Sequence, residues 1–402
     1  GKSGTVYFKK GRSYAAWDSL LGNSSLMPAH KVAGQNFNNL WQDSIDIASG
    51  PFKFQSWQKG TQLTIVKNAA FKAGPAAKLD RIVFRYIAGA SEFQALRSGE
   101  ADVMEPQAQI QIVDFYNDSK FKVQAGQGYQ WEHLDFQQGE KAHPALKKKF
   151  VRQAIIQGIN RAQIREVLYV KTGLVRDPKL LPVLQSHIFK PFEKDYVPAF
   201  AKWKFSQRNV IALLKKNGCT GGPDTPSASN SKIFSCPGVG SLEIAFTTTS
   251  GNPLRALTFE IIQRQLKSVG ILFTPRFISP AVLFGGGVLT GSDWQAVLFT
   301  FLGSPSSSAT FFSIGGCGGD QNYGNACNQK VSKLLQKAQF TPDAADRAEL
   351  LHAAEKIMAE DVFSIPLFAR PTWVLNSNKV KGPVRNPTNQ STTWNTEVWR
   401  VS

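Results

Sequence analysis

The sequence predicts an α/β protein with two lobes, and three observations support this prediction. The chain has 402 residues, more than the roughly 250–300 that a single hydrophobic core usually organises. Strand and helix patterns alternate in residues 50–104 and again beyond residue 144. The composition, 42% hydrophobic and 19% charged, is typical of a globular protein rather than a disordered or membrane-embedded one.

The first region is rich in strands. Residues 50–71 predict a hairpin, because apolar side chains alternate on both sides of the turn at Lys59 and Gly60. Residues 81–86 predict a further strand, 91–98 a short helix, and 101–104 another strand.

The second region contains longer helices. Apolar residues recur at helical spacing in 151–164, 253–268 and 343–361. The strands predicted between them are 271–277, which follows Gly270, and the uncharged run 296–301. Residues 219–237 consist mainly of turn formers and predict an exposed loop.

The formal net charge is +18, from 47 basic and 29 acidic residues. A binder of nucleic acid or another polyanion would carry such a charge as one contiguous basic face and bind with steep salt dependence. Here the basic residues are scattered, and the densest run is residues 147–149. The scatter favours a solvated surface, or one that faces an anionic membrane, and we expect no nucleic-acid partner.

The four cysteines form two close pairs in the sequence, Cys219 with Cys236 and Cys317 with Cys327. Neither pair has the spacing of a zinc site or a CxxC redox motif. We expect two disulfides that close surface loops, which implies an oxidising compartment. The alternative is four unpaired thiols in a cytosolic protein.

The signals for catalysis and for metal binding are weak. The best candidate among the five histidines is His133, which has Glu132 and Asp135 nearby. Neighbouring residues on a strand point to opposite faces, so Glu132 and His133 should not converge, and a structural histidine is the simpler interpretation. The longest uncharged stretch, 294–319, is interrupted by glycines, serines and a proline and predicts no membrane span.

Several segments resemble the extracellular solute-binding proteins of family 5, which serve peptide, nickel, opine and related ABC importers. They occur in the family's order and extend over nearly the whole chain: SGPFKF at 49–54, KLDRIVFR at 78–85 with ALRSGEADV at 95–103, FVRQAI at 150–155 with INR at 159–161, and AEKI at 354–357 with IPLF at 365–368.

The resemblance implies the two-lobed fold of periplasmic binding proteins (type II, cluster C-like) with an incomplete first lobe. Residues 1–49 would be the remnant of a small extra subdomain. Residues 50–135 with 375–402 would form lobe one, and 136–374 lobe two. The chain would cross between the lobes near 130–136 and 373–375. We also expect a further segment, with an export signal, upstream of the first residue.

The same resemblance places the ligand between the lobes, which close around it. For each aromatic residue of the site, core packing is the alternative to ligand binding. For Asp320, the alternative is a structural role in a turn. The expected ligand-binding residues are Pro106, Gln107, Tyr129, Trp131, Phe301, Ser304, Ser306, Asp320, Gln321, Asn322 and Tyr323.

One departure from the family concerns the ligand itself. Peptide-binding members carry an aspartate that pairs with the peptide's ammonium group in the loop corresponding to residues 301–307. Here no acidic residue occurs between Asp293 and Asp320. With the basic net charge, this favours a neutral or anionic solute such as a glycoside, a modified peptide or a phosphorylated opine.

The resemblance therefore implies a monomeric, non-enzymatic protein that captures an oligopeptide or related solute and delivers it to a membrane permease. It would act outside the cytoplasmic membrane, either free in the periplasm or as a lipoprotein, and without a cofactor or bound metal. A hydrolase remains an alternative, as does a sensory or chaperone protein on the same fold.

Overall fold

The computed structural model describes residues 5, 7–9, 13–17, 27–87, 89, 91–304, 308–388 and 390–402. The chain divides into two compact units. Unit 1 contains residues 1–19, 129–171 and 177–370, and unit 2 contains residues 20–128, 172–176 and 371–402. Two long strands, β5 (Phe121–Phe136) and β11 (Ser364–Ser377), contribute residues to both units. The lobe boundaries expected at 135/136 and 374/375 stay a prediction.

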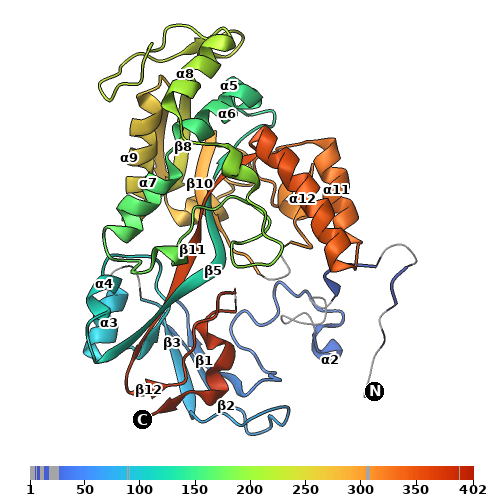
Figure 1. Ribbon diagram of the computed structural model, residues 1–402. Helices are drawn as coiled ribbons and strands as arrows, with labels where there is room; N and C mark the ends of the chain where they lie inside the picture. The colour runs from blue at the N-terminus through green and yellow to red at the C-terminus, as the bar shows by residue number, and fades with distance from the viewer. Residues whose placement is uncertain are drawn as a thin grey trace. The chain divides into compact units, whose positions relative to one another are not determined.

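Unit 1 is built on five adjacent strands in the order β11-β5-β10-β8-β9. Strand β10 (Ala296–Phe301) is antiparallel to β5 and parallel to β8 (Glu243–Thr249), which is parallel to β9 (Leu272–Ile278). The helices around these strands (Figure 1) are α5 (Pro144–Lys147), α6 (Lys149–Gly158), α7 (Arg161–Arg165), α8 (Gln207–Lys216), α9 (Pro253–Lys267), α10 (Phe312–Gly315), α11 (Gln329–Gln339) and α12 (Ala344–Asp361).

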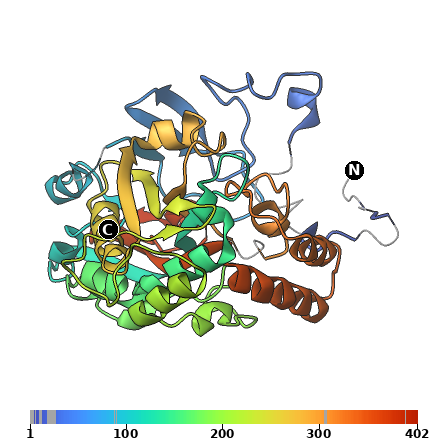
Figure 2. The ribbon, with the colours of Figure 1, turned by 90° about the horizontal axis from the view of Figure 1, so that it is seen from above.

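Shorter elements complete unit 1. Helices α11 and α12 pack side by side in both views of the ribbon (Figures 1 and 2). The remaining pieces are η1 (Glu166–Val170), η2 (Pro178–Leu180), η3 (Ala199–Lys202), η4 (Ala281–Gly285), and the two-residue strands β6 (Ser235–Cys236) and β7 (Gly240–Ser241).

Unit 2 contains a three-stranded antiparallel sheet, β1-β2-β3. Its strands are β1 (Phe52–Gln58), β2 (Gln62–Lys67) and β3 (Arg81–Arg85). The predicted hairpin at 50–71 is therefore confirmed. The other elements are α2 (Ala29–Val32), α3 (Ser91–Ser98), β4 (Val103–Met104), α4 (Ile112–Phe115), β12 (Val380–Lys381), η5 (Thr392–Val398) and β13 (Arg400–Val401).

Both expected disulfides are present. Cys219 bonds Cys236 at the base of the loop that follows α8, and Cys317 bonds Cys327 in the loop between α10 and α11. The structure thus pairs the cysteines as neighbours in sequence and excludes the alternative of free thiols.

Two arginines of the segments that resemble the family are structural. Arg152 is 6% exposed and donates hydrogen bonds to the carbonyl oxygens of Leu146, Asp361 and Val362 at 2.7–3.1 Å. These bonds satisfy carbonyls at the carboxyl end of α12, where Val362 adopts a left-handed conformation with φ of 48°. Arg161, also 6% exposed, donates to the carbonyl oxygens of Leu184 and Pro366 at 2.8 and 2.9 Å.

Candidate functional site

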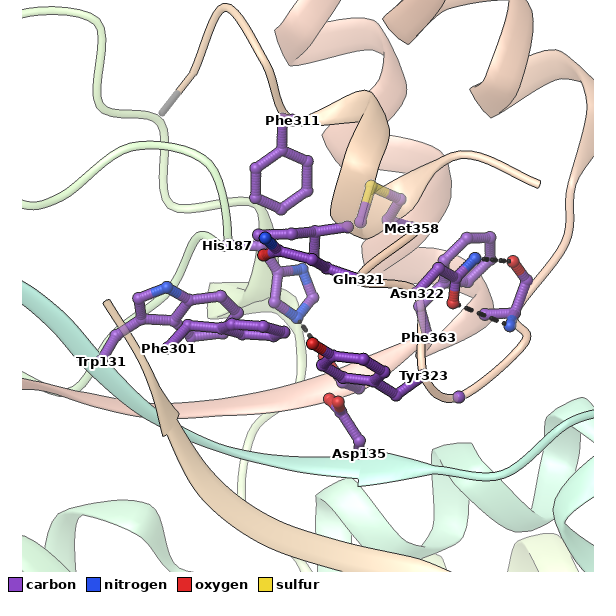
Figure 3. Close-up of a pocket in the computed structure, with 14 residues that line it drawn as sticks. Trp131, Asp135, His187, Phe301, Phe311, Gln321, Asn322, Tyr323, Met358 and Phe363 are labelled. Carbon is purple, nitrogen blue, oxygen red and sulfur yellow. Dashed lines mark hydrogen bonds between the residues drawn. The ribbon is translucent and has the colours of Figure 1, made fainter. Parts of the chain in front are cut away.

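Strands β5 and β10 place four rings of unit 1 on one face of the sheet. The register pairs Phe301 with Trp131 and Phe299 with His133, so the alternation of side chains along a strand directs all four to the same side. The ring of His133 stacks on Phe301 with centroids 4.6 Å apart and planes 7° apart, and Trp131 lies 5.5 Å from Phe301. Two of these rings, Trp131 and Phe301, form the floor of a small cavity (Figure 3).

The loop between the two cysteines of the second disulfide forms one wall. Tyr323 stacks against Phe301 with centroids 6.2 Å apart and planes 14° apart. The buried amide of Asn322 donates to the carbonyl oxygens of Gly316 and Ala326, and its oxygen accepts from the amide of Ala326. Asn322 therefore shapes the loop and presents no free amide to the cavity.

A chain of polar contacts forms the opposite wall. The hydroxyl of Ser364 and Nε2 of His187 lie 2.7 Å apart, and Nδ1 of His187 lies 3.3 Å from the carboxylate of Glu355. Burial alone would raise the pKa of Glu355, but bonds from His187 and Ser186 outweigh it and lower that pKa. The backbone amides of His187 and Ile188 also donate to this carboxylate, at 2.7 and 3.0 Å.

A buried lysine contacts the Trp131 ring. Nζ of Lys190 is 5.0 Å from the centre of the Trp131 ring and donates to the carbonyl oxygen of His187 at 2.9 Å. Burial lowers the pKa of Lys190 to about 8, although Glu193 and Glu355 raise it in part. The lysine thus adds positive charge next to an electron-rich ring, a favourable cation–π arrangement.

The cavity has a volume of about 30 Å³, room for one or two water molecules. It combines aromatic walls with a few polar groups, as small-molecule sites do. Its lining comes from four separate parts of unit 1: Trp131, Asp135, His187, Phe301, Phe311, Ile314, Gln321, Asn322, Tyr323, Gly324, Ala326, Met358, Phe363 and Ser364.

Five of the residues expected from the sequence meet at this cavity, namely Trp131, Phe301, Gln321, Asn322 and Tyr323. Trp131 and Phe301 are only 3% and 7% exposed and also belong to a hydrophobic cluster of unit 1. These two rings therefore belong both to the hydrophobic core and to the cavity wall.

The other expected residues of unit 1 that the structure describes are not among the lining of this cavity. Asp320 is exposed and accepts a hydrogen bond from the hydroxyl of Ser313. The ring of Tyr129 packs edge to face against Phe192 at 5.0 Å. Ser304 is partly exposed, and Ser306 lies outside the described residues.

Two expected residues belong to unit 2. Pro106 is buried and Gln107 is exposed. The preceding residue, Glu105, accepts hydrogen bonds from the hydroxyls of Ser391 and Thr392 and from the amide of Thr392, at 2.7–2.9 Å. A role of Pro106 and Gln107 in ligand binding stays a prediction.

Sequence patterns missed three polar residues of the cavity. Asp135 was noted only as a neighbour of His133 and was not expected to bind ligand. His187 and Ser364 are 177 residues apart, and no local pattern predicts a contact over that separation. The one available signal was the turn-like segment around His187, which contains polar residues within an apolar stretch.

The site does not have the geometry of a catalytic centre. Ser364, His187 and Glu355 lie in the order of a catalytic triad, but the water-sized cavity beside them leaves no room for an acyl substrate. Glu132 and His133 point to opposite faces of β5, as expected, since Glu132 contacts Arg255 and His133 contacts Phe301. Within the described part of the chain, no three His, Cys, Asp or Glu side chains gather to hold a metal.

None of the described helices combines the length and the hydropathy that crossing a membrane would require.

Comparisons with known proteins agree with this architecture. The periplasmic EDTA-binding protein EppA has a TM-score of 0.84 at 18% identity, and the match covers 97% of this chain and 72% of that one. NikZ from Campylobacter jejuni, in complex with Ni(L-His), has a TM-score of 0.78 at 21% identity over 96% of this chain and 75% of that one. At these identities the likeness shows the fold.

Curated relatives are similar in sequence. A Brucella ovis protein, named for peptide binding by an ABC transporter, is 27% identical over 279 residues, which cover 68% of this chain and 47% of that protein. Di/tripeptide-binding protein 1 of Pseudomonas aeruginosa is 22% identical over 80% of this chain and 55% of its own length. The chain thus spans about half the length of the curated relatives it matches.

The model of the family described as "Bacterial extracellular solute-binding proteins, family 5 Middle" matches residues 4–323. This match covers well over half of the chain and agrees with the two-lobed fold of the structural neighbours. The chain therefore belongs to family 5 of the bacterial extracellular solute-binding proteins.

Proposed function

We propose that this chain is the substrate-binding part of an ABC importer, which captures an oligopeptide or a related small solute outside the cytoplasmic membrane and delivers it to a permease. The observation that carries the proposal is the family match over residues 4–323. The relatives it resembles are named for binding di- and tripeptides and for peptide transport, the latter being SapA of Salmonella typhimurium.

The aromatic cavity of unit 1 supports a binding role. Stacked rings give a rigid apolar surface at low cost in side-chain entropy, and the polar groups of His187 and Asp135 can orient a ligand beside it. Because the cavity itself holds only water-sized groups, we propose that the solute rests against its aromatic wall. Gln321 and Tyr323 would contact it there.

The fold accommodates solutes of different chemistry. Structural neighbours are named for EDTA, for Ni(L-His) and for a nonapeptide, which are ligands of different charge and size. We propose a neutral or anionic solute, because no acidic residue lies between Asp293 and Asp320. We further propose that the protein acts as a monomer without a cofactor or an enzymatic activity, free in the periplasm or anchored by a lipid.

Native mass spectrometry of the protein, purified gently from its host, tests this function. We expect a small solute that stays bound under native conditions and is lost on denaturation. Tyr323→Leu should reduce the bound fraction, whereas Tyr86→Leu, a control at a 53% exposed position of unit 2, should not. Ligand at 100 times its Kd should stabilise the protein by about 2.7 kcal/mol. An empty protein whose melting temperature is unchanged by peptides, sugars and metal chelates would contradict the proposal.

A further inference from the structure

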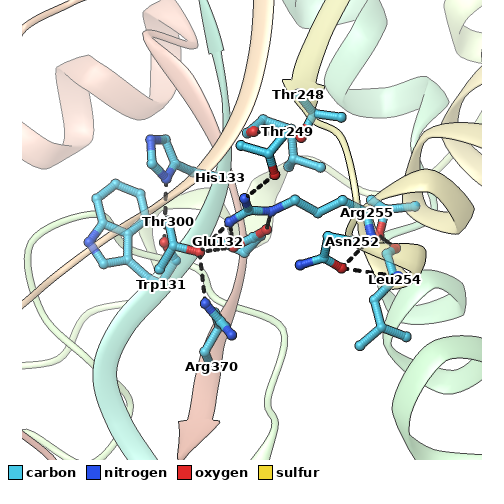
Figure 4. A network of polar contacts seen from close by, with 12 residues as sticks. Trp131, Glu132, His133, Thr248, Thr249, Asn252, Leu254, Arg255, Thr300 and Arg370 are labelled. Carbon is cyan, nitrogen blue, oxygen red and sulfur yellow. Dashed lines mark hydrogen bonds and ion pairs between the residues drawn. The ribbon is translucent and has the colours of Figure 1, made fainter. Parts of the chain in front are cut away.

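A second polar cluster lies on the other face of β5, and it holds more positive than negative charge. Glu132 of β5 is 5% exposed and pairs with Arg255 of α9, whose Nε lies 2.8 Å from the carboxylate. Arg370 of β11 approaches the same group, and its Nη1 lies 3.3 Å from the hydroxyl oxygen of Thr300. Arg255 therefore contacts the carboxylate directly, whereas Arg370 reaches it through Thr300 and by its charge, which helps to lower the pKa of Glu132 (Figure 4).

All three guanidinium nitrogens of Arg255 have partners. Its Nε and Nη2 contact the carboxylate of Glu132, its Nη1 donates to the hydroxyl of Thr249 at 2.7 Å, and its Nη2 also reaches Thr300 at 3.0 Å. Thr300 in turn donates its proton to Glu132. Burial would raise the pKa of Glu132, but Arg255 and Arg370 outweigh it and hold that pKa at about 2. Glu132 thus remains ionised and neutralises one of the two arginines.

Arg370, in contrast, has N–H donors that form no hydrogen bond within the described part of the protein. Among the described residues, the bond to Thr300 is the one hydrogen bond that its guanidinium makes, although a guanidinium carries five N–H donors. Its remaining nitrogens are not among the buried polar atoms that lack a partner. The unused donors of Arg370 are therefore open to solvent or to a ligand.

The strands open to solvent at this point. In the fourteen-residue strand β11, every residue is buried except Arg370 and the final Ser377. In β10, Thr300 is the one residue that is not buried. Since Arg370 and Thr300 are hydrogen-bonded to each other, the two partly exposed positions form a single accessible polar spot between two otherwise largely buried strands.

The topology favours a ligand here. Thr249 ends β8 and Thr300 is the penultimate residue of β10, and these two strands are parallel. Ligands of open α/β sheets bind at the carboxyl ends of parallel strands. The fifteen-residue helix α9 also begins here, and although Asn252 caps its first amides, the positive end of its dipole and the charge of Arg255 remain.

We propose that Arg370, backed by Thr300 and Arg255, receives an anionic group of the captured solute, either a carboxylate or a phosphate. This inference rests on the proposed binding function and assigns that function a ligand class. A planar guanidinium with free donors can bind either anion through two parallel hydrogen bonds. The incoming anion would balance the second arginine as Glu132 balances the first.

Titration with simple anions tests the proposal. The probes are inorganic phosphate and acetate, with chloride at equal ionic strength as the reference, and the readouts are melting temperature and calorimetry. Wild type should bind phosphate or acetate, and the anion that binds more tightly indicates which group the solute carries. Arg370→Gln should weaken this binding about tenfold or more, the loss expected when a charged hydrogen bond disappears.

Two further variants make the outcome decisive. Arg276→Gln removes an arginine of the same unit whose partner is Asp293, and it should bind anions like wild type. Arg370→Lys keeps the charge but loses the planar fork, so it should bind anions more weakly even if Arg370→Gln fails to fold. The proposal would be overturned if the wild-type protein bound neither phosphate nor acetate, or if both Arg370 variants bound them as tightly as wild type.

Native mass spectrometry separates this inference from the proposed function. A solute retained equally by wild type and Arg370→Gln would refute the anion site and leave the binding function intact. Absence of any solute, together with anion binding that depends on Arg370, would refute the function and leave the anion site intact.

Discussion

The two faces of β5 in unit 1 bury their polar side chains in different environments. On one face, Trp131 and His133 lie among aromatic rings, and Lys190 contacts the Trp131 ring as a cation. On the other face, Glu132 is buried with full charge and is balanced by two arginines. Neighbouring residues of one strand thus belong to an aromatic cavity and to an ionic cluster, so the alternation of the strand keeps the two chemistries apart.

The largest effect on stability is expected from removing the charge of Glu132, which the two arginines balance. Glu132→Gln leaves Arg255 and Arg370 without their counter-ion and should lower the free energy of unfolding by about 3–5 kcal/mol. Urea unfolding followed by circular dichroism measures this loss. Glu243→Gln, on the exposed end of β8, is the control and should change stability by less than about 0.5 kcal/mol. Equal stabilities of the two variants would mean that the ionic cluster is not needed for the fold.

Acidification should reduce the stabilising contribution of Glu132 within a defined pH range. The pKa of Glu132 is about 2 in the folded protein and 4.5 in the absence of the protein environment. A lowered folded pKa gives stability that is complete above the unfolded pKa and is lost as pH falls through the folded one. The difference in unfolding free energy between wild type and Glu132→Gln should therefore shrink by about 3 kcal/mol between pH 5 and pH 2. A difference that does not vary with pH would show that Glu132 titrates normally.

The disulfides distinguish the cavity wall from a remote loop. The pairs close loops of similar length, with separations of 17 and 10 residues, and each should contribute about 3 kcal/mol in a chain-entropy account. Cys317→Ser with Cys327→Ser should also loosen the loop that carries Tyr323 and reduce solute binding. Cys219→Ser with Cys236→Ser should lower the melting temperature similarly but leave binding unchanged. A loss of binding in both double variants would argue against a specific role of the cavity wall.

The smallest effect concerns the hydrogen bond between Ser364 and His187 in the cavity wall. Ser364→Ala removes the hydroxyl that meets Nε2 of His187 and leaves a buried ring nitrogen without its partner, which should cost about 1–2 kcal/mol. Chemical unfolding measures the change. Ser313→Ala, whose hydroxyl bonds the exposed Asp320, should have almost no effect. If Ser364→Ala is equally silent, the bond to His187 contributes nothing to stability.

Local patterns predicted much of the scaffold. Helix α3 and strand β10 have the predicted bounds, and the ends of α9 and α12 differ from the prediction by one residue. These elements depend on periodicity within the segment itself, which the sequence displays directly. The disulfides were predictable for the same reason, since each joins cysteines that are close in sequence.

The polar partners of the candidate sites could not be predicted in this way. Glu132 and Arg255 are 123 residues apart, and Ser364 and His187 are 177 apart. Such pairs arise from the order of strands in the sheet, and periodicity does not specify that order. The sequence did indicate that Glu132 and His133 would separate, because that conclusion needs only the geometry of a single strand.

The positions of Arg152 and Arg161 affect how relatives of this protein are recognised. Both side chains donate hydrogen bonds to carbonyl oxygens inside unit 1. The motifs around them therefore reflect the stability of the fold and do not indicate which solute is bound. This agrees with the structural neighbours, which share the fold but are named for ligands as different as EDTA, Ni(L-His) and a nonapeptide. If the proposed anion site exists, a comparison by ligand class would instead use the polar residues on the sheet, such as Thr300 and Arg370, which these motifs do not include.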